Sequence, residues 1–107
     1  DKNQLKQVFI NIIQNAIDAM SYGGIITITI IKSEKEMLEI HILDTGPGMD
    51  EQTVNKIFNL YYSSKNTGTG IGLSVVQKIV QEHNGTVSVE SKPGKGTDFI
   101  IVLPSEV

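Results

Sequence analysis

Several residue types are missing from this sequence of 107 residues, and each absence excludes a class of protein. There is no cysteine, which excludes a disulfide scaffold and a thiolate metal site and is compatible with a reducing compartment. There is no arginine either, and because the nine lysines form no basic run and the formal net charge is −3, we expect no nucleic-acid partner. No apolar run approaches the length of a membrane span, and the first residues do not form a signal peptide. We therefore expect a soluble, cytoplasmic chain without direct membrane contact of its own, which is compatible with a membrane anchor elsewhere in a longer parent protein.

The stretch that organises the rest of the sequence holds three glycines at alternate positions, Gly68, Gly70 and Gly72, and leads directly into an apolar helical pattern from Leu73. The backbone N–H groups of such a loop and the positive end of the helix dipole point at one place and favour an anion there, most commonly phosphate. The spacing is neither that of a P-loop nor that of a Rossmann fingerprint. By itself the run leaves two interpretations open, a phosphate-binding loop and a flexible linker followed by a helix.

The first segment is predicted to be a helix that stops at the Gly23-Gly24 pair. Its apolar residues share one face at helical spacing: Leu5, Val8, Phe9, Ile12, Ile13, Ala16, Ile17 and Met20. Asn11, Asn15 and Asp18 share a second, polar face. This face could simply be solvated, but asparagine is a poor helix former and amide oxygens suit a hard cation such as Mg²⁺. Both interpretations remain open at this point.

The remaining periodicity predicts four strands and two further helices. The strands are expected at residues 25–31, 37–43, 86–90 and 97–103, and the helices at residues 51–58 and 73–83. The order α-β-β-α-α-β-β predicts a single α/β domain, a two-layer sandwich in which helices pack on one face of a mixed β-sheet. His41 is expected on the exposed face of its strand without an acidic partner, and His83 is expected to interact with a helix dipole, so neither is predicted to be catalytic.

Asp44 ends a predicted strand and is followed by Thr45, Gly46, Pro47 and Gly48. A carboxylate only accepts hydrogen bonds, so Asp44 could recognise an exocyclic amine such as that of adenine. The same residues also favour an Asx-type turn, and Asp-Thr-Gly after an apolar strand is typical of aspartic proteases as well.

The loop ahead of the glycine run, residues 59–67, is polar and irregular and carries Tyr61, Tyr62 and Lys65. A loop of this length beside a phosphate site is often a mobile lid. Lys65 is then a candidate phosphate contact, although a single lysine in a loop is usually only solvated.

Five segments stand in one order, and together they resemble a known family. They are Asn11–Asp18, Asp44–Gly48, Ile57–Tyr62, Gly68–Leu73 and Gly94–Thr97. In this order they resemble the N, G1, F, G2 and G3 boxes of the ATP-binding catalytic domain (HATPase_c) of two-component sensor histidine kinases, within the GHKL superfamily that includes gyrase, Hsp90 and MutL. The run from Tyr61 to Val76 is most similar to nitrogen-regulator and Bacillus sporulation kinases. The resemblance covers nearly the whole chain and implies the Bergerat ATP-binding fold for residues 1–107 as one domain.

The resemblance implies ATP or ADP and Mg²⁺ as cofactors and a role for each matched position. Asn15 would coordinate the Mg²⁺, with Asn11 one turn earlier, and both would be catalytic together with Lys65. Asp44 would accept a hydrogen bond from the adenine amine, with help from Thr97. The further nucleotide-binding positions that it implies are Asp18, Gly46, Gly48, Phe58, Tyr61, Tyr62, Lys65, Gly68, Thr69, Gly70, Ile71, Gly72 and Leu73. Gly46 and Gly48 would leave room beside the base, the glycine loop and Lys65 would hold the phosphates, and residues of about 59–72 would form the lid.

One position separates kinases from ATPases in this superfamily. The hydrolysing members carry a glutamate one turn before the metal-binding asparagine, where it acts as a general base, whereas this sequence has Asn11. The resemblance therefore implies phosphoryl transfer to a histidine of a dimerisation and phosphoacceptor domain, expected before Asp1, with a response regulator downstream. The family's usual first strand is also absent from the sequence. The alternatives are an anti-sigma-type serine protein kinase, a non-catalytic ATP-binding switch of the same fold, and a retropepsin-like aspartic protease built on Asp44.

Overall fold

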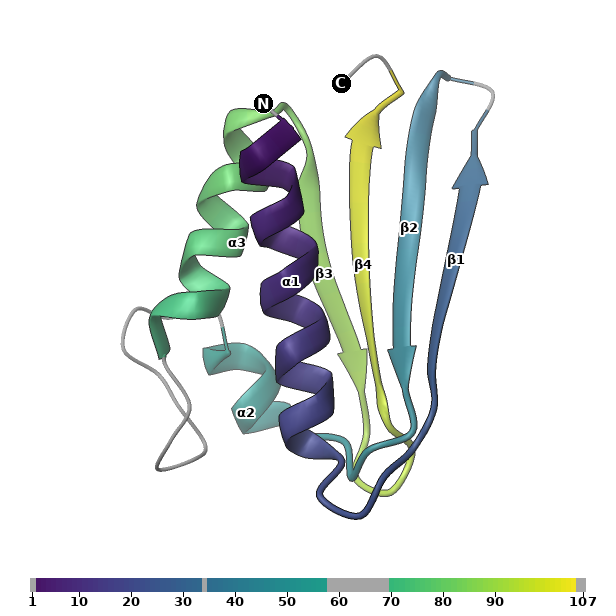
Figure 1. The fold of residues 1–107 in the computed structure, drawn as a ribbon, viewed down its shortest axis with the longest axis vertical. Coiled ribbons are helices and arrows are strands. Elements are labelled where there is room, and N and C mark those ends of the chain that lie inside the picture. Colours follow the sequence, from purple (N-terminus) through teal and green to yellow (C-terminus); the bar gives the residue numbers. More distant parts are fainter. Residues whose placement is uncertain (1, 34, 58–69, 106–107) are drawn as a thin grey trace.

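The structure is a computed structural model that describes residues 2–33, 35–57 and 70–105, and Figure 1 shows its layout. In chain order the elements are α1 (Lys2–Ala19), β1 (Ile26–Lys32), β2 (Met37–Asp44), α2 (Glu51–Lys56), α3 (Gly70–Glu82), β3 (Thr86–Ser91) and β4 (Thr97–Pro104). The predicted order of helices and strands is confirmed. In the described part of the chain, no helix combines the length and the apolar character needed to cross a membrane.

The four strands form one sheet in the order β1-β2-β4-β3. Each of these neighbouring pairs is antiparallel, so the expectation of a mixed sheet is wrong for the described residues. The physical reason is the position of β4. The helical connection makes β2 and β3 run in the same direction, but β4 inserts between them and pairs antiparallel with both.

The predicted two-layer sandwich is confirmed, because the helices lie on one face of the sheet (Figure 1). Buried and half-buried residues alternate strictly along β4, because every second side chain points into the space between the layers. The core holds the following fully buried aliphatic side chains: Val8, Ile12, Ile42, Val76, Val80 and Ile101. Burial of this apolar surface is what holds α1 and α3 on the sheet.

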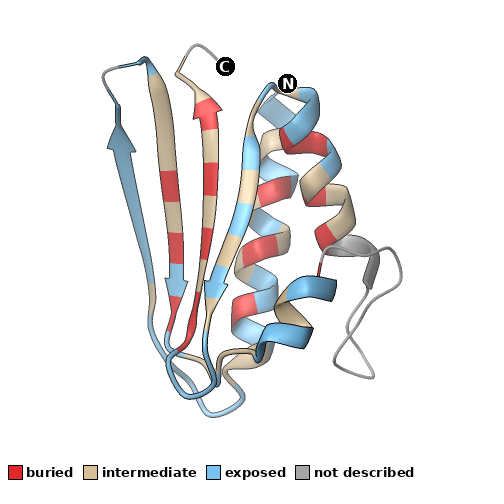
Figure 2. Cartoon of the chain, turned by 180° about the vertical axis from the view of Figure 1, so that it is seen from behind, coloured by how far each residue is buried: buried red, intermediate tan, exposed pale blue. Residues whose placement is uncertain are grey.

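The strand β1 lies at one edge of the sheet and is the least buried strand (Figure 2). Its isoleucines are largely exposed, with Ile28 at 51% and Ile30 at 63% relative exposure. Ile17 of α1, which the helical spacing assigned to the apolar face, is also half exposed, at 51%. The buried stripe of α1 is therefore narrower than predicted and is centred on Val8, Ile12 and Ala16.

The helix ends follow local rules. Asp50 caps α2 by accepting a hydrogen bond from the Thr53 amide at 2.8 Å, and this bond lowers the pKa of the Asp50 carboxyl. After α3, Asn84 adopts a positive φ of 63°, which ends the helix as predicted. His83 donates from Nδ1 to the Ile79 carbonyl at 2.8 Å, so it satisfies a carbonyl of the last helical turn.

Candidate functional site

Several of the predicted site residues meet at one end of the molecule. The end of β2, the start of β4, the C-terminal half of α1, the helix α2 and the first turn of α3 all lie toward this end (Figure 1). Asp44 is the last residue of β2 and Thr97 the first residue of β4. The fold thus brings segments from four of the five predicted boxes to the same region.

Asp44 and Thr97 form a directly opposed pair on the helix-covered face of the sheet. They are the two buried polar residues of the described chain, with relative exposures of 4% and 6%. Oδ1 of Asp44 accepts a hydrogen bond from the Gly46 amide at 2.8 Å, which is the Asx-type turn expected as one alternative. A carboxylate has two oxygens and about four acceptor positions, so this turn leaves capacity for a donor on a ligand.

Ser91 links the segments on either side of Thr97, and no motif in the sequence pointed to this residue. Its hydroxyl accepts from the Met49 amide at 2.8 Å, donates to the Gly96 carbonyl at 2.9 Å, and lies 2.9 Å from the Thr97 hydroxyl. Because the single Ser91 proton goes to Gly96, Thr97 is the donor in the remaining contact. Ser91 thereby ties the loop after β2 to the loop between β3 and β4.

Glycines allow these two loops to approach each other closely. Gly48 has a positive φ of 75°, and a Cβ at this position would clash with the Lys92 carbonyl. Gly96 has a positive φ of 79°, and a Cβ there would clash with the Asp44 carbonyl. The amide of Gly94 also donates to the Pro47 carbonyl at 2.7 Å. These contacts give Gly48 a role in loop packing, beside its predicted role next to a base.

The polar face of α1 is only partly committed to contacts within the helix. Asn11 is half-buried and accepts a hydrogen bond from Gln7 at 2.7 Å, while Asp18 is exposed and accepts one from Gln14 at 3.0 Å. Asn15 lies between them and is exposed, so its amide oxygen is accessible to a ligand. The described residues include no cluster of three or more histidine, cysteine, aspartate or glutamate side chains suited to a metal. A Mg²⁺ ion would fit here only as one bound mainly by phosphate oxygens and water with few protein ligands, which is its usual mode.

The helix α3 begins at Gly70, three residues before the predicted start at Leu73. The backbone of Gly70, Ile71 and Gly72 therefore forms the first helical turn, where N–H groups have no partner within the helix. Residues 70–72, the last three of the predicted lid, are thus helical. Leu73 is 7% exposed and belongs to the core, so only its backbone could contact a ligand. The predicted residues Phe58, Tyr61, Tyr62, Lys65, Gly68 and Thr69 lie outside the described residues.

An open hollow of about 750 Å³ lies beside this region rather than in it. It is lined by residues of the β3–β4 loop and of α2, including Lys92, Pro93 and Val54, together with Met49. It includes Gly96 but neither Asp44 nor Asn15. The hollow therefore adjoins the base of the candidate site at Ser91 and Gly96 without including its predicted ligand-binding side chains.

The groups that the candidate site offers to a ligand fit a nucleotide. It offers a buried carboxylate as an acceptor for an amine, a helix N-terminus for an anion and an exposed amide for a hard cation. Comparison with known families agrees with this chemistry. The family described as "Histidine kinase-, DNA gyrase B-, and HSP90-like ATPase" matches residues 1–107, and the chain belongs to this family.

Individual relatives include sporulation kinases and sensor histidine kinases. Sporulation kinase C of Bacillus subtilis (strain 168) is 46% identical over 97% of this chain and 24% of its own length. The sensor histidine kinase ZraS of Klebsiella oxytoca is 41% identical over 97% of this chain and 22% of its own length. The solved catalytic domain of histidine kinase ThkA superposes with a TM-score of 0.86 at 35% identity, over 98% of this chain and 68% of that one. The predicted resemblance to sensor histidine kinase catalytic domains, and to the sporulation kinases among them, is confirmed.

The chain spans about a quarter of the length of these curated relatives. Family membership and the two-layer fold also exclude the aspartic protease hypothesis for Asp44. The Asp-Thr-Gly run is used here for a turn at the end of β2.

Proposed function

We propose that this chain binds ATP with Mg²⁺ and transfers the γ-phosphoryl group to a histidine on the dimerisation domain of the same kinase. The observation that carries the proposal is the buried pair of Asp44 and Thr97 at the same end of the fold as the first turn of α3. A response regulator would receive the phosphoryl group afterwards. Because ATP is available in the cytoplasm, we place the activity there.

Each described residue has a distinct task in this proposal. Asp44 orients the base by accepting its amine, and the Ser91–Thr97 contact holds the segment that carries Thr97. The N–H groups at the start of α3 hold phosphate oxygens. Asn15 presents its amide oxygen to the metal, which when bound would neutralise charge on the phosphates.

The first experiment tests the nucleotide site and its metal. ADP is titrated into the protein with and without Mg²⁺ by calorimetry, and the titration is repeated with Asn15→Ala and, as a control on the same helix, Ile10→Ala. We expect Mg²⁺ to strengthen binding, Asn15→Ala to remove most of this metal effect, and Ile10→Ala, at 58% exposure, to leave it unchanged. Metal-independent binding that Asn15→Ala does not alter would contradict the role of Asn15.

A second experiment separates transfer from hydrolysis. The carboxamide of Asn11 cannot accept a proton from water at neutral pH, whereas a glutamate at this place could. Asn11→Glu should raise the rate of ATP hydrolysis by roughly 10²-fold or more, in the range of a positioned general base. Asn11→Gln, which has the same side-chain shape as Asn11→Glu but no basic carboxylate, should not raise it. Fast hydrolysis by the unaltered chain, or equal rates in both variants, would contradict the assignment as a phosphotransferase.

A further inference from the structure

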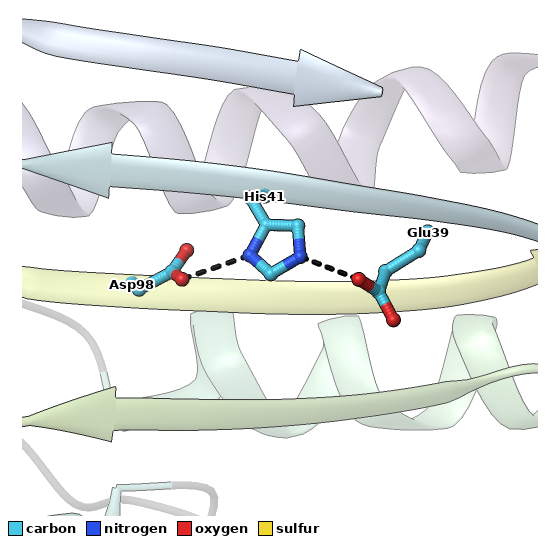
Figure 3. A network of polar contacts seen from close by, with 3 residues as sticks. All are labelled: Glu39, His41 and Asp98. Atoms are coloured by element: carbon cyan, nitrogen blue, oxygen red, sulfur yellow. Dashed lines mark hydrogen bonds and ion pairs between the residues drawn. The ribbon is translucent and has the colours of Figure 1, made fainter. Parts of the chain in front are cut away.

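A polar cluster lies on the face of the sheet opposite the helices. The side chains of Ile40 and Ile42 point into the core, so their neighbours Glu39 and His41 on β2 point to the other face. Asp98 of β4 lies on this outer face as well (Figure 3). The expectation that His41 lies on the outer face is confirmed, but the expectation that it has no acidic partner is wrong. Glu39 lies two residues earlier on the same face of β2, and Asp98, distant in the sequence, reaches His41 through strand pairing.

Both ring nitrogens of His41 contact a carboxylate. Nε2 lies 2.7 Å from Oε2 of Glu39, and Nδ1 lies 2.8 Å from Oδ2 of Asp98. A neutral imidazole has one N–H group, so it could donate to only one of them and would turn a lone pair toward the other. The imidazolium ion donates to both. Accordingly the pKa of His41 is raised above its usual value of 6.5, first by the hydrogen bond to Glu39 and then by that to Asp98.

Two lysines of the β3–β4 loop, Lys92 and Lys95, line the same hollow as Asp98, but on the described strands themselves no other cation lies beside these carboxylates. Directly opposite His41 lie the uncharged Thr29 of β1 and Ile100 of β4, and opposite Asp98 lies the acidic Glu90 of β3. Among the described strand residues on this face, His41 is therefore the only group that can carry positive charge. Oδ1 of Asp98 is buried without a hydrogen-bond partner in the described structure, so the close contact of Oδ2 with His41 is important for this carboxylate.

The cluster lies directly behind the candidate nucleotide site. Asp98 follows Thr97 in β4, and in the ladder Leu43 is paired with Asp98 while Asp44 is paired with Thr97. The contact from His41 to Asp98 is thus a diagonal tie between β2 and β4, one register step from the Asp44–Thr97 pair. A change in this tie acts on the strand ends that carry both site residues.

We propose that His41 is a proton-controlled positioning residue for nucleotide binding: its imidazolium ties β4 to β2 behind Asp44 and Thr97, and loss of the proton loosens the pair and weakens binding. The inference rests on the proposed nucleotide site and adds a regulation of that site by pH.

The direction of the effect follows from the raised pKa. The tie is complete at pH values below 6.5, where the histidine is protonated in folded and unfolded chains alike, and it is lost as the pH rises through the raised pKa of the folded protein. Affinity for a nucleotide should therefore decrease on the alkaline side of neutrality. The contacts are partly exposed, so the effect is screened by salt and should be measured at constant ionic strength.

The test is the dissociation constant of ADP measured from about pH 6 to about pH 9, together with the pKa of His41 from the NMR shifts of its ring protons. As the pH rises over this range, we expect the ADP affinity of the natural protein to fall by roughly three- to tenfold more than that of His41→Gln. The midpoint of this additional loss should coincide with the measured pKa of His41. The comparison with His41→Gln removes the titration of the ADP phosphate itself, which is common to both proteins.

A second variant makes the test independent of the folding of His41→Gln. Glu39→Gln removes the largest contribution to the raised pKa but keeps the imidazole, so it should move the midpoint of the affinity profile to lower pH. A residue with a purely structural role would not move this midpoint. Ser88→Ala, on the same outer face but without a titratable or charged group, should leave the profile unchanged.

The outcomes separate the inference from the proposed function. Parallel pH profiles for the natural protein and His41→Gln, or an unmoved midpoint in Glu39→Gln, would overturn the inference while leaving the nucleotide site intact. Absence of ADP binding at every pH in all of these proteins would overturn the nucleotide site, and the inference with it.

Discussion

Asp44 and Thr97 face each other directly across the β2–β4 ladder, and both are buried. A carboxylate at 4% exposure is unusual in a layer otherwise filled by aliphatic side chains. Asp44 lies at the end of its strand, next to the loops. The desolvation cost of this buried acceptor therefore falls at a place where a ligand could donate to it.

Asp44→Asn should lower the affinity for ADP by at least about tenfold with little change in thermal stability. An asparagine oxygen can still accept from the Gly46 amide, so the turn is kept, but its NH₂ group meets an adenine amine with a second donor. Calorimetric titration with ADP and a thermal melt measure the two effects. Asp50→Asn is the matched control, since asparagine also caps helices and Asp50 caps α2. Unchanged affinity in Asp44→Asn would argue against base recognition by this carboxylate.

Gly96→Ala should destabilise the protein more than Gly94→Ala does. The two glycines have nearly the same positive φ, 79° and 80°, so the conformational cost of a side chain, about 1–2 kcal/mol, is common to both. A Cβ at Gly94 meets no atom within 4 Å, whereas one at Gly96 clashes with the Asp44 carbonyl. We expect Gly96→Ala to cost about 1–3 kcal/mol more in urea denaturation and to reduce ADP affinity. Equal unfolding free energies for the two variants would show that the loop adjusts without moving Asp44.

Ser91→Ala should lower the free energy of unfolding by about 1–3 kcal/mol. The change leaves the Met49 amide and the Gly96 carbonyl without the partner that the hydroxyl supplies. Ser88→Ala on the same strand is exposed and should stay within about 0.5 kcal/mol of the natural protein. Chemical denaturation of both variants gives the comparison, and similar values for the two would mean that water replaces the Ser91 contacts at no cost.

Ile12→Ala should lower the free energy of unfolding by about 2–5 kcal/mol, because it leaves a cavity between α1 and the sheet. Ile12 is fully buried at 0% exposure, while Ile10 on the same helix is 58% exposed. Ile10→Ala should therefore change the unfolding free energy by no more than about 0.5 kcal/mol. A thermal or urea unfolding series measures both, and a small effect for Ile12→Ala would mean that the core around α1 collapses to fill the space.

The sequence by itself determined the element types and the family, and it predicts the chemistry of the candidate site. Helical and strand periodicity record which face of each element is apolar, so the strands and helices could be predicted one at a time. The start of α3 was predicted three residues late because glycines are poor helix formers, although the first turn tolerates them where their N–H groups have other uses. The spacing of the five boxes added the assignment to a kinase family.

Only the tertiary structure decided how these elements pair. The insertion of β4 between β2 and β3 made the described sheet antiparallel, and the same insertion brought Asp98 to His41 across 57 positions of sequence. The folded chain also brings Met49 to Ser91 across 42 positions of sequence, at the base of the site. Such contacts depend on strand order, which arises from packing of the whole core. The local pattern of apolar and polar residues shows which face of a strand is buried, but not which strand lies beside it.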